Sequence, residues 1–277
     1  LNRYCYRERI AIATVAALTL VVAGLAAAHD MFLKPTRFFL EPGATLDLLL
    51  LNGNFTNSEN SIARNRLLDV SVLGPNGRVR VDTAQWSVAG DTSSFSVLVG
   101  VAGTWQLGVS TRPNIIPLTG AEFNEYLASD GIPDVLAARK RDGELERGVR
   151  ERYHKHVKAL VQVGDTPSEQ FSTALGYPAE LVPLENPYTL RPGSVLRFRA
   201  LVDGTPVANQ HVQYGGRTAS GGRIEMRAVR TDAQGVGQVR LSEAGTWYLM
   251  FISMTRLTGD SEADYESKWA SLTFAIR

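Results

Sequence analysis

The sequence predicts a mainly β protein with two immunoglobulin-like β-sandwich units joined by a helical insert, after an N-terminal signal peptide. Three observations predict this arrangement. The chain of 277 residues opens on an uncharged apolar segment. The remainder contains a weak internal repeat of short apolar runs bounded by turns, which is typical of repeated β units. A charged segment with helical signals separates the two copies of the repeat.

The opening segment has the layout of a secretory signal peptide. Three arginines lie within the first nine residues, the range 10–28 carries no charge, and this range ends in three alanines. Small residues in this pattern are typical of a signal peptidase site, so we expect cleavage after Ala28. The apolar run is also near the lower limit for crossing a bilayer, so an uncleaved membrane anchor is the alternative. Cleavage makes His29 the first residue of a periplasmic or otherwise exported protein.

Two stretches far apart in the chain follow the same order of turns and strands. Pro42-Gly43 leads into a leucine-rich run, and Pro192-Gly193 leads into a similar alternating run. Each copy is followed by Ala-Gly-Thr-Trp, which ends at Trp105 in the first copy and at Trp247 in the second. Because large aromatic residues mostly lie inside sandwich cores, we predict both tryptophans to be core residues. The repeat predicts two copies of one supersecondary plan.

Between the two units the sequence predicts helices. Thr119 and Glu122 have the spacing of a capping box, which begins a short helix ending at Ser129. A second helix is expected over 134–141 and a third over 144–161, where acidic and basic residues recur four positions apart. The predicted organisation is a signal peptide at 1–28, a first unit at 29–118, the helical insert at 119–163, a linker at 164–187 and a second unit at 188–277.

Removal of the leader leaves a chain with almost no net charge and no cysteine. The leader holds three of the 29 basic residues, one of the 28 acidic residues and the single cysteine, Cys5. The mature chain therefore has 26 basic and 27 acidic residues, a balance that argues against a nucleic acid partner. Without cysteine it has no disulfide and no thiolate metal site, so its stability depends on its core.

Histidine is the residue type that most strongly indicates chemistry. The chain has four histidines: His29, His154, His156 and His211. A histidine at a free N-terminus offers a metal ion its amine and its Nδ1, and a second imidazole completes a three-nitrogen site that suits Cu(II) or Ni(II). We predict such a site at His29, completed by one of the other three. On a helix over 144–161, His154 and His156 would point about 200° apart, so only one could join, and His156 lies on the apolar face.

Signatures of catalysis are lacking in the sequence. It has no G-x-S-x-G, no H-E-x-x-H and no phosphate-binding glycine loop. Glu262, Asp264 and Glu266 lie close together, and we interpret them as a solvated loop because no pocket is indicated that would raise a pKa. The protein is therefore expected not to be an enzyme, with cleavage of envelope carbohydrate by these carboxylates as the minor alternative.

Eight stretches of the chain carry a resemblance to a bacterial family. They are Ala28–Asp30 with Phe32 and Pro35, Arg150–Tyr153, Lys158–Leu160, Leu184–Pro187, Leu190–Gly193, Thr231–Gly235, Gly245–Trp247 and Tyr265–Phe274. In these residues the sequence resembles the exported, nickel-uptake-associated (NikM-like) family of unknown function. The resemblance implies immunoglobulin-like domains and a genomic link to nickel or cobalt uptake. Family members often have a His-Met pair where this chain has Ser253-Met254, so one candidate ligand of the family is replaced.

These observations predict a periplasmic transition-metal-binding accessory protein for nickel, copper or cobalt uptake. Its N-terminal histidine would chelate Ni(II) or Cu(II), and its partners would be the metal ion and a membrane metal transporter. Contact with the membrane itself is expected only through an uncleaved leader. The alternative is a non-catalytic immunoglobulin-like module that binds protein or carbohydrate in the cell envelope. Such a module would tolerate changes at all four histidines.

Overall fold

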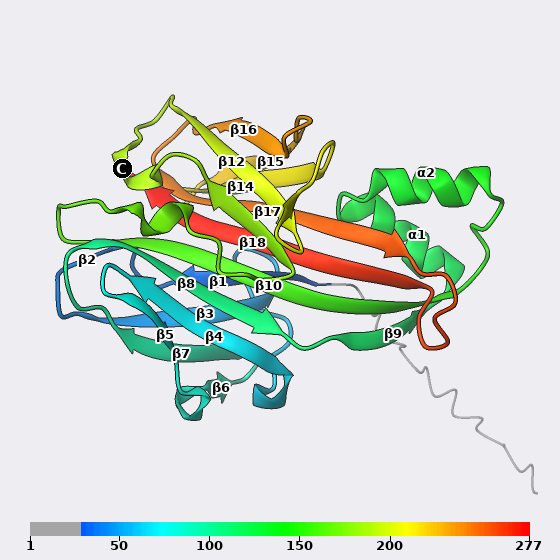
Figure 1. Cartoon of the computed structure of the whole chain (residues 1–277), viewed down its shortest axis with the longest axis horizontal. Helices are drawn as coiled ribbons and strands as arrows, with labels where there is room; N and C mark the ends of the chain where they lie inside the picture. The colour runs from blue at the N-terminus through cyan, green and yellow to red at the C-terminus, as the bar shows by residue number, and fades with distance from the viewer. Residues whose placement is uncertain (1–28) are drawn as a thin grey trace, which may run out of the picture.

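The computed structural model describes residues 29–277 and confirms a mainly β protein with several sheets (Figure 1). The predicted signal peptide, 1–28, lies outside the described residues. A ten-stranded sheet runs through the middle of the molecule, and a four-stranded sheet covers part of each of its faces. Within residues 29–277, none of the helices is long and apolar enough to cross a membrane.

The central sheet contains strands from both halves of the chain. Its order is β15 (Arg223–Arg230), β14 (His211–Thr218), β17 (Gly245–Arg256), β18 (Tyr265–Ile276), β10 (Val149–Val163), β8 (Gly103–Thr111), β4 (Leu67–Gly74) and β5 (Gly77–Arg80), with β2 (Phe39–Leu40) and β9 (Asn114–Leu118) also paired to β10. The two halves meet where β10 pairs in parallel with β18, from Glu151 opposite Tyr265 to Ala159 opposite Thr273. One continuous hydrogen-bonded sheet therefore joins them.

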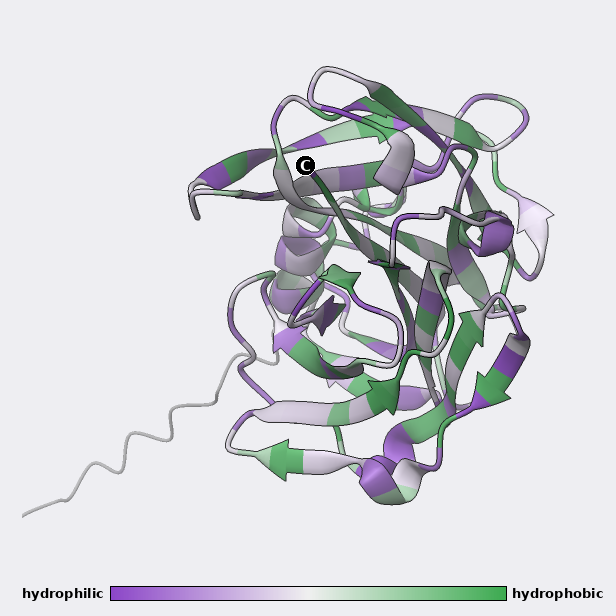
Figure 2. Ribbon diagram, turned by 90° about the vertical axis from the view of Figure 1, so that its left-hand side faces the viewer, coloured by the Kyte–Doolittle hydropathy of each residue, from purple (hydrophilic) through white to green (hydrophobic). Residues whose placement is uncertain are grey.

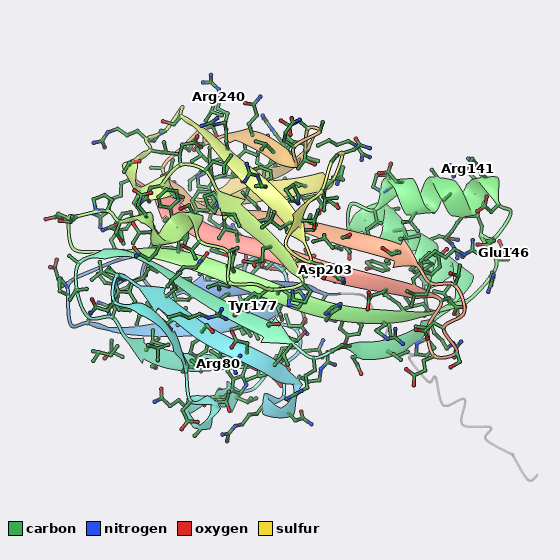
Figure 3. All side chains as sticks on the ribbon, in the orientation of Figure 1. Arg80, Arg141, Glu146, Tyr177, Asp203 and Arg240 are labelled. Carbon is green, nitrogen blue, oxygen red and sulfur yellow. The ribbon has the colours of Figure 1, made fainter. Side chains whose placement is uncertain are left out.

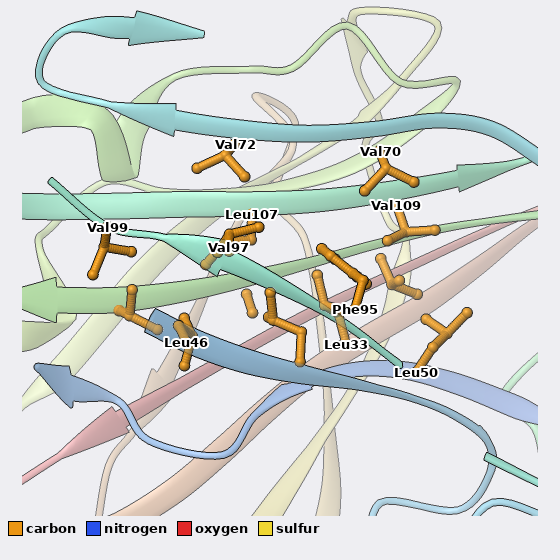
Figure 4. Packing of buried hydrophobic residues seen from close by; sticks show 14 of the residues in the cluster. Leu33, Leu46, Leu50, Val70, Val72, Phe95, Val97, Val99, Leu107 and Val109 are labelled. Carbon is orange, nitrogen blue, oxygen red and sulfur yellow. The ribbon is translucent and has the colours of Figure 1, made fainter. Parts of the chain in front are cut away.

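Two smaller sheets cover opposite faces of the central one. The first contains β1 (Asp30–Pro35), β3 (Thr45–Gly53), β7 (Thr92–Leu98) and β6 (Ser87–Ala89), and the second contains β11 (Ala179–Pro183), β12 (Val195–Val202), β13 (Thr205–Pro206) and β16 (Val236–Arg240). On β10, Val157, Ala159 and Val161 face the core beneath the first sheet, while Leu160 faces the core beneath the second. Figure 4 shows the first of these cores. Alternation along β10 thus supplies both cores.

The two copies of the sequence repeat make equivalent contacts. Trp105 Nε1 donates to the carbonyl of Val101 at 3.0 Å, and Trp247 Nε1 donates to the carbonyl of Glu243 at 3.1 Å, each four residues back. Trp247 is buried as predicted, whereas Trp105 is only partly buried against the first core. Purple and green residues alternate along some of the strands in Figure 2, as half-buried strands require.

The first two predicted helices are confirmed. Helix α1 (Gly120–Ser129) begins with the predicted capping box, since Thr119 Oγ1 accepts from the backbone of Glu122 at 3.2 Å and Glu122 Oε2 accepts from the backbone of Thr119 at 2.8 Å. Helix α2 (Pro133–Arg141) follows, and both lie at one end of the central sheet, where Arg141 is labelled in Figure 3. Short 3₁₀ turns lie at Arg64–Arg66, Thr83–Gln85, Glu169–Ser172 and Pro187–Thr189.

The third predicted helix, 144–161, is wrong, because most of that range belongs to strand β10. Residues His154 to Val163 are buried on both faces of the sheet, so the strand lacks the alternation that marks a half-buried strand in a sequence. Its charged residues look like a solvated helix face in the sequence. In the fold, Glu151, Lys155 and Lys158 are buried and hydrogen-bonded.

Candidate functional site

The four histidines occupy three separate places. His29 precedes β1, His154 and His156 lie together on one face of β10, and His211 begins β14. His29 contacts the opposite face of β10, through Lys155. The structure therefore brings His29 together with none of the other three. Across residues 29–277, no three side chains of His, Cys, Asp or Glu gather closely enough to hold a metal ion.

His29 is held at the start of the first strand by a buried lysine. Lys155 Nζ donates to the backbone carbonyl of His29, and it also contacts Oδ1 of Asn52 at 3.2 Å. The ladder of β1 and β3 begins at the next residue, where Asp30 lies opposite Gly53. The imidazole Nδ1 lies 3.2 Å from Oε2 of Glu59. A backbone anchor and a carboxylate therefore fix both ends of this residue.

Glu59 reaches His29 because a tight loop follows β3. Within that loop, Asn54 Oδ1 accepts hydrogen bonds from the backbone amides of Thr56 and Asn57, and Glu59 N donates to the carbonyl of Asn52 at 2.9 Å. At Gly53 a Cβ would lie 2.6 Å from the Asn57 carbonyl oxygen, so only glycine permits this close packing.

A cavity of about 470 Å³ opens beside His29. It lies on the face of β10 between the first outer sheet and the helical end, and its walls include His29, Met31, Arg66, Tyr153, Lys155 and Trp269. Lys155 Nζ lies 4.7 Å from the ring centroid of Trp269, an arrangement in which the ring stabilises the ammonium. Met31 packs in the first core. The walls are thus aromatic and cationic near the histidine.

Burial perturbs four ionisable groups here: Glu151 and Lys155, which line the cavity, and Asp30 and Asp130, which interact with Lys155. It raises the pKa of Asp30 to about 7, helped by repulsion from Asp130, while Lys155 opposes the shift. Burial also raises the pKa of Asp130 to about 6 and the pKa of Glu151 above its usual range. The pKa of Lys155 falls to about 8, again mainly through burial. Groups with such shifts gather at functional sites more often than elsewhere.

Glu151 forms the far wall of the cavity and belongs to a buried hydrogen-bond network. Its Oε1 accepts from Tyr126 Oη at 2.9 Å and from Ser267 Oγ, which itself accepts from Trp269 Nε1 at 2.9 Å. Its Oε2 has no hydrogen-bond partner within the described chain. Helix α1 and strand β18 thereby fix the wall against which a ligand would rest.

His154 and His156 form a hydrogen-bonded pair, contrary to the prediction that they diverge. On a strand, residues two apart share a face, and His156 Nε2 lies 3.2 Å from His154 Nδ1. His156 Nδ1 contacts Ser110 Oγ at 2.9 Å, and His154 Nε2 lies 3.9 Å from Glu266 Oε1. Burial lowers the pKa of His156 to about 3, with a smaller contribution from His154.

The buried imidazole makes stability depend on pH. Because the folded-state pKa of His156 lies below the unfolded value of about 6.5, the unfolded chain binds the extra proton. This contribution is complete above pH 6.5 and is lost as pH falls toward 3, by up to about 1.4 kcal/mol per pH unit. We expect His156→Gln to flatten the pH dependence of urea-unfolding free energy between pH 6 and 4. If the unfolding free energy of His156→Gln depends on pH as steeply as that of the wild type, His156 is not the source of this dependence.

His211 does not line the cavity. Its ring approaches Gly131, where a Cβ would lie 2.8 Å from His211 Nδ1, and burial lowers its pKa. Glu262, Asp264 and Glu266 do not form a shared pocket. Asp264 Oδ2 accepts a hydrogen bond from Arg150 N at 2.8 Å, and Glu262 forms an ion pair with Arg152 at 3.2 Å. The sequence did not identify Glu59, Arg66, Glu151 and Lys155 as site residues. The four-residue spacing of Glu151 and Lys155 instead indicates a helix in the sequence.

Fold and site together define a layered β protein with a cavity beside His29 whose walls are partly apolar and partly charged. Its family model is a domain of unknown function, DUF4198, which matches residues 26–255. The chain belongs to that family. The description assigns no activity, so the link to nickel uptake stays a prediction. Among curated proteins, none matches this sequence.

Solved structures are only distantly similar. A DUF4785 family protein of Legionella pneumophila is 12% identical, with 78% of this chain and 50% of that chain covered and a TM-score of 0.24. A tandem repeat from the extending region of a large adhesion protein is 12% identical, with 89% and 49% covered and a TM-score of 0.22. FdeC, an Escherichia coli adhesin, is 14% identical, with 89% and 63% covered and a TM-score of 0.23. This chain thus spans about half to two thirds of their length.

Proposed function

We propose that this protein is an exported accessory protein that binds one transition-metal ion at His29, after cleavage behind Ala28. The observation that carries the proposal is the position of Glu59, whose carboxylate lies 3.2 Å from Nδ1 of His29. Cleavage would add the free amine of the same residue. The site would then have an amine nitrogen, an imidazole nitrogen and a carboxylate oxygen, in place of the second imidazole expected from the sequence.

This set of donors fits the ions that the sequence suggested. Nitrogen ligands suit Ni(II) and Cu(II), and an oxygen ligand from carboxylate is compatible with both. The absence of cysteine from residues 29–277 argues against a soft thiolate site for Cu(I). The Lys155 contact to the His29 carbonyl holds the residue while its imidazole faces the loop that carries Glu59. Fixed ligands bind a metal with less loss of side-chain entropy.

Partial exposure of the ligands supports a role in transfer. The His29 side chain is 21% exposed and that of Glu59 is 51% exposed, so a partner protein could approach both. A fully buried structural site would exchange its ion slowly, whereas a carrier must release it. Delivery to a membrane transporter is therefore the role that we propose, with nickel, copper or cobalt as cargo.

The test is metal analysis of protein exported through its own leader and purified without chelators. We expect an intact mass that begins at His29 and close to one Ni(II) or Cu(II) per chain on titration calorimetry. His29→Ala should abolish this binding, because it removes the imidazole. His211→Ala is the matched control, since that histidine lies elsewhere in the fold. Equal affinity in the wild type and His29→Ala would refute the proposal.

A further inference from the structure

The cavity beside His29 contains two cations, Arg66 and Lys155, whose hydrogen bonds are all with neutral groups, although the carboxylates of Asp30, Glu151 and Asp130 also attract Lys155. Arg66 Nη2 donates to the carbonyl of Arg112 at 3.0 Å, and Lys155 Nζ contacts the His29 carbonyl and Asn52 Oδ1. Arg66 Nε is buried and has no acceptor among residues 29–277. A buried donor without an acceptor costs free energy unless water or a ligand supplies one. The cavity therefore has capacity for an anion.

Both cations contact the same aromatic ring. The guanidinium of Arg66 lies 5.4 Å from the ring centroid of Tyr153, and Lys155 Nζ lies 5.6 Å from the same centroid. The ring stabilises each cation but leaves their mutual repulsion in place. Among the described residues that line the cavity, the one carboxyl is that of Glu151, whose Oε1 is already engaged by Tyr126 and Ser267. An anion beside Arg66 would supply the acceptor that its Nε lacks among residues 29–277, and it would also offset the repulsion between Arg66 and Lys155.

We propose that the cavity binds a small organic carboxylate, which enters together with the metal ion. One carboxylate group pairs with Arg66 and Lys155, because a guanidinium binds carboxylate oxygens through two parallel hydrogen bonds. A second donor group of the same molecule faces His29 and adds a ligand to the ion. The part of the inference that concerns the metal rests on the proposed function, whereas the carboxylate site stands on its own contacts.

The dimensions of the cavity favour an organic anion over an inorganic one. Its volume of about 470 Å³ is in the range of sites for small molecules and exceeds what phosphate or sulfate would fill. Apolar walls from Met31, Ile116 and Trp269 provide contact for a carbon skeleton, and Arg66 and Lys155 provide the charge. A short dicarboxylate matches both features.

The test is titration calorimetry with succinate, a dicarboxylate that binds free divalent ions only weakly. Mature protein is titrated with and without one equivalent of Ni(II), as wild type, Arg66→Gln and Arg64→Gln. Arg64 is the matched control, since it is exposed and bonds Thr83 Oγ1 at 3.2 Å outside the cavity. We expect tighter succinate binding to the nickel-loaded protein, and about tenfold weaker binding in Arg66→Gln alone.

The outcomes test the carboxylate site and the metal function separately. Equal succinate affinity in Arg66→Gln and wild type would overturn the carboxylate site, and so would equally strong competition by inorganic phosphate. Succinate that binds with the same affinity with and without Ni(II) would overturn joint entry with the metal. A protein that binds no Ni(II) would refute the proposed metal function, while the metal-free titrations of Arg66→Gln would still support or overturn the carboxylate site.

Discussion

Replacement of Glu180 by alanine is expected to lower the free energy of unfolding by about 3–5 kcal/mol, the range for breaking a buried ion pair. Glu180 and Lys158 are both buried, and Glu180 Oε2 lies 2.8 Å from Lys158 Nζ. Glu180 also accepts from the backbone amides of Leu175, Gly176 and Tyr177 at 2.7–2.9 Å. Alanine would leave an ammonium and three amides without an acceptor in the interior.

The pair links two layers of the fold, which is why its loss should be global. Lys158 lies on β10 of the central sheet and Glu180 on β11 of the second outer sheet. The measurement is equilibrium urea unfolding. An unchanged dependence of the unfolding free energy on urea concentration would show that only stability changed. Glu185→Ala is the control, since its pair with Arg197 lies at the surface, with the Arg197 side chain 57% and the Glu185 side chain 26% exposed, and should contribute no more than about 1 kcal/mol.

The two partners of this pair are expected to differ. Lys158→Met removes the cation but leaves the Glu180 carboxylate with its three backbone donors. A carboxylate that accepts several amides remains stabilised as an anion, so the loss should be smaller than for Glu180→Ala. Equal losses in the two variants would show that the ion pair alone, without the amides, accounts for the effect.

How far the sequence predicted the fold depends on how each segment is buried. The turns of the repeat, the Trp247 core position and the capping box at Thr119 are local signals, and all three are confirmed. Strand β10 is buried on both faces, so its sequence has no strand periodicity. Its charged residues at four-residue spacing then favoured a helix. The parallel pairing with β18 joins residues more than a hundred positions apart, which no local pattern encodes.

The candidate site was predicted at one residue and missed at the others. His29 was predicted because it follows the alanines of the expected cleavage site, and cleavage there would give it a free amine beside its imidazole. Its neighbours come from a loop after β3 and from the middle of β10. Glu59 and Lys155 resemble ordinary surface residues in composition. Only the fold, which lays β1 against β3 and over β10, brings them to the histidine.

A chain that keeps residues 21–28 ahead of His29 is expected to bind Ni(II) or Cu(II) at least about a hundredfold more weakly than the chain beginning at His29. Both chains contain the imidazole and the Glu59 carboxylate, and they differ at this site only in the free amine. Loss of an outer-shell partner of a metal ligand commonly costs 10–100-fold in affinity, so loss of a direct ligand should cost at least as much. A hundredfold change is about 2.7 kcal/mol.

This comparison separates the amine from the side chain, which His29→Ala cannot do. Titration of the two chains under the same conditions measures the amine alone, and the same pair of chains carrying His29→Ala measures what the extension does without the site. If the extended chain binds as tightly as the mature one, the imidazole and Glu59 suffice and cleavage has no part in metal binding. If only the mature chain binds, export and metal loading are coupled, because the ligand set does not exist until the leader is removed.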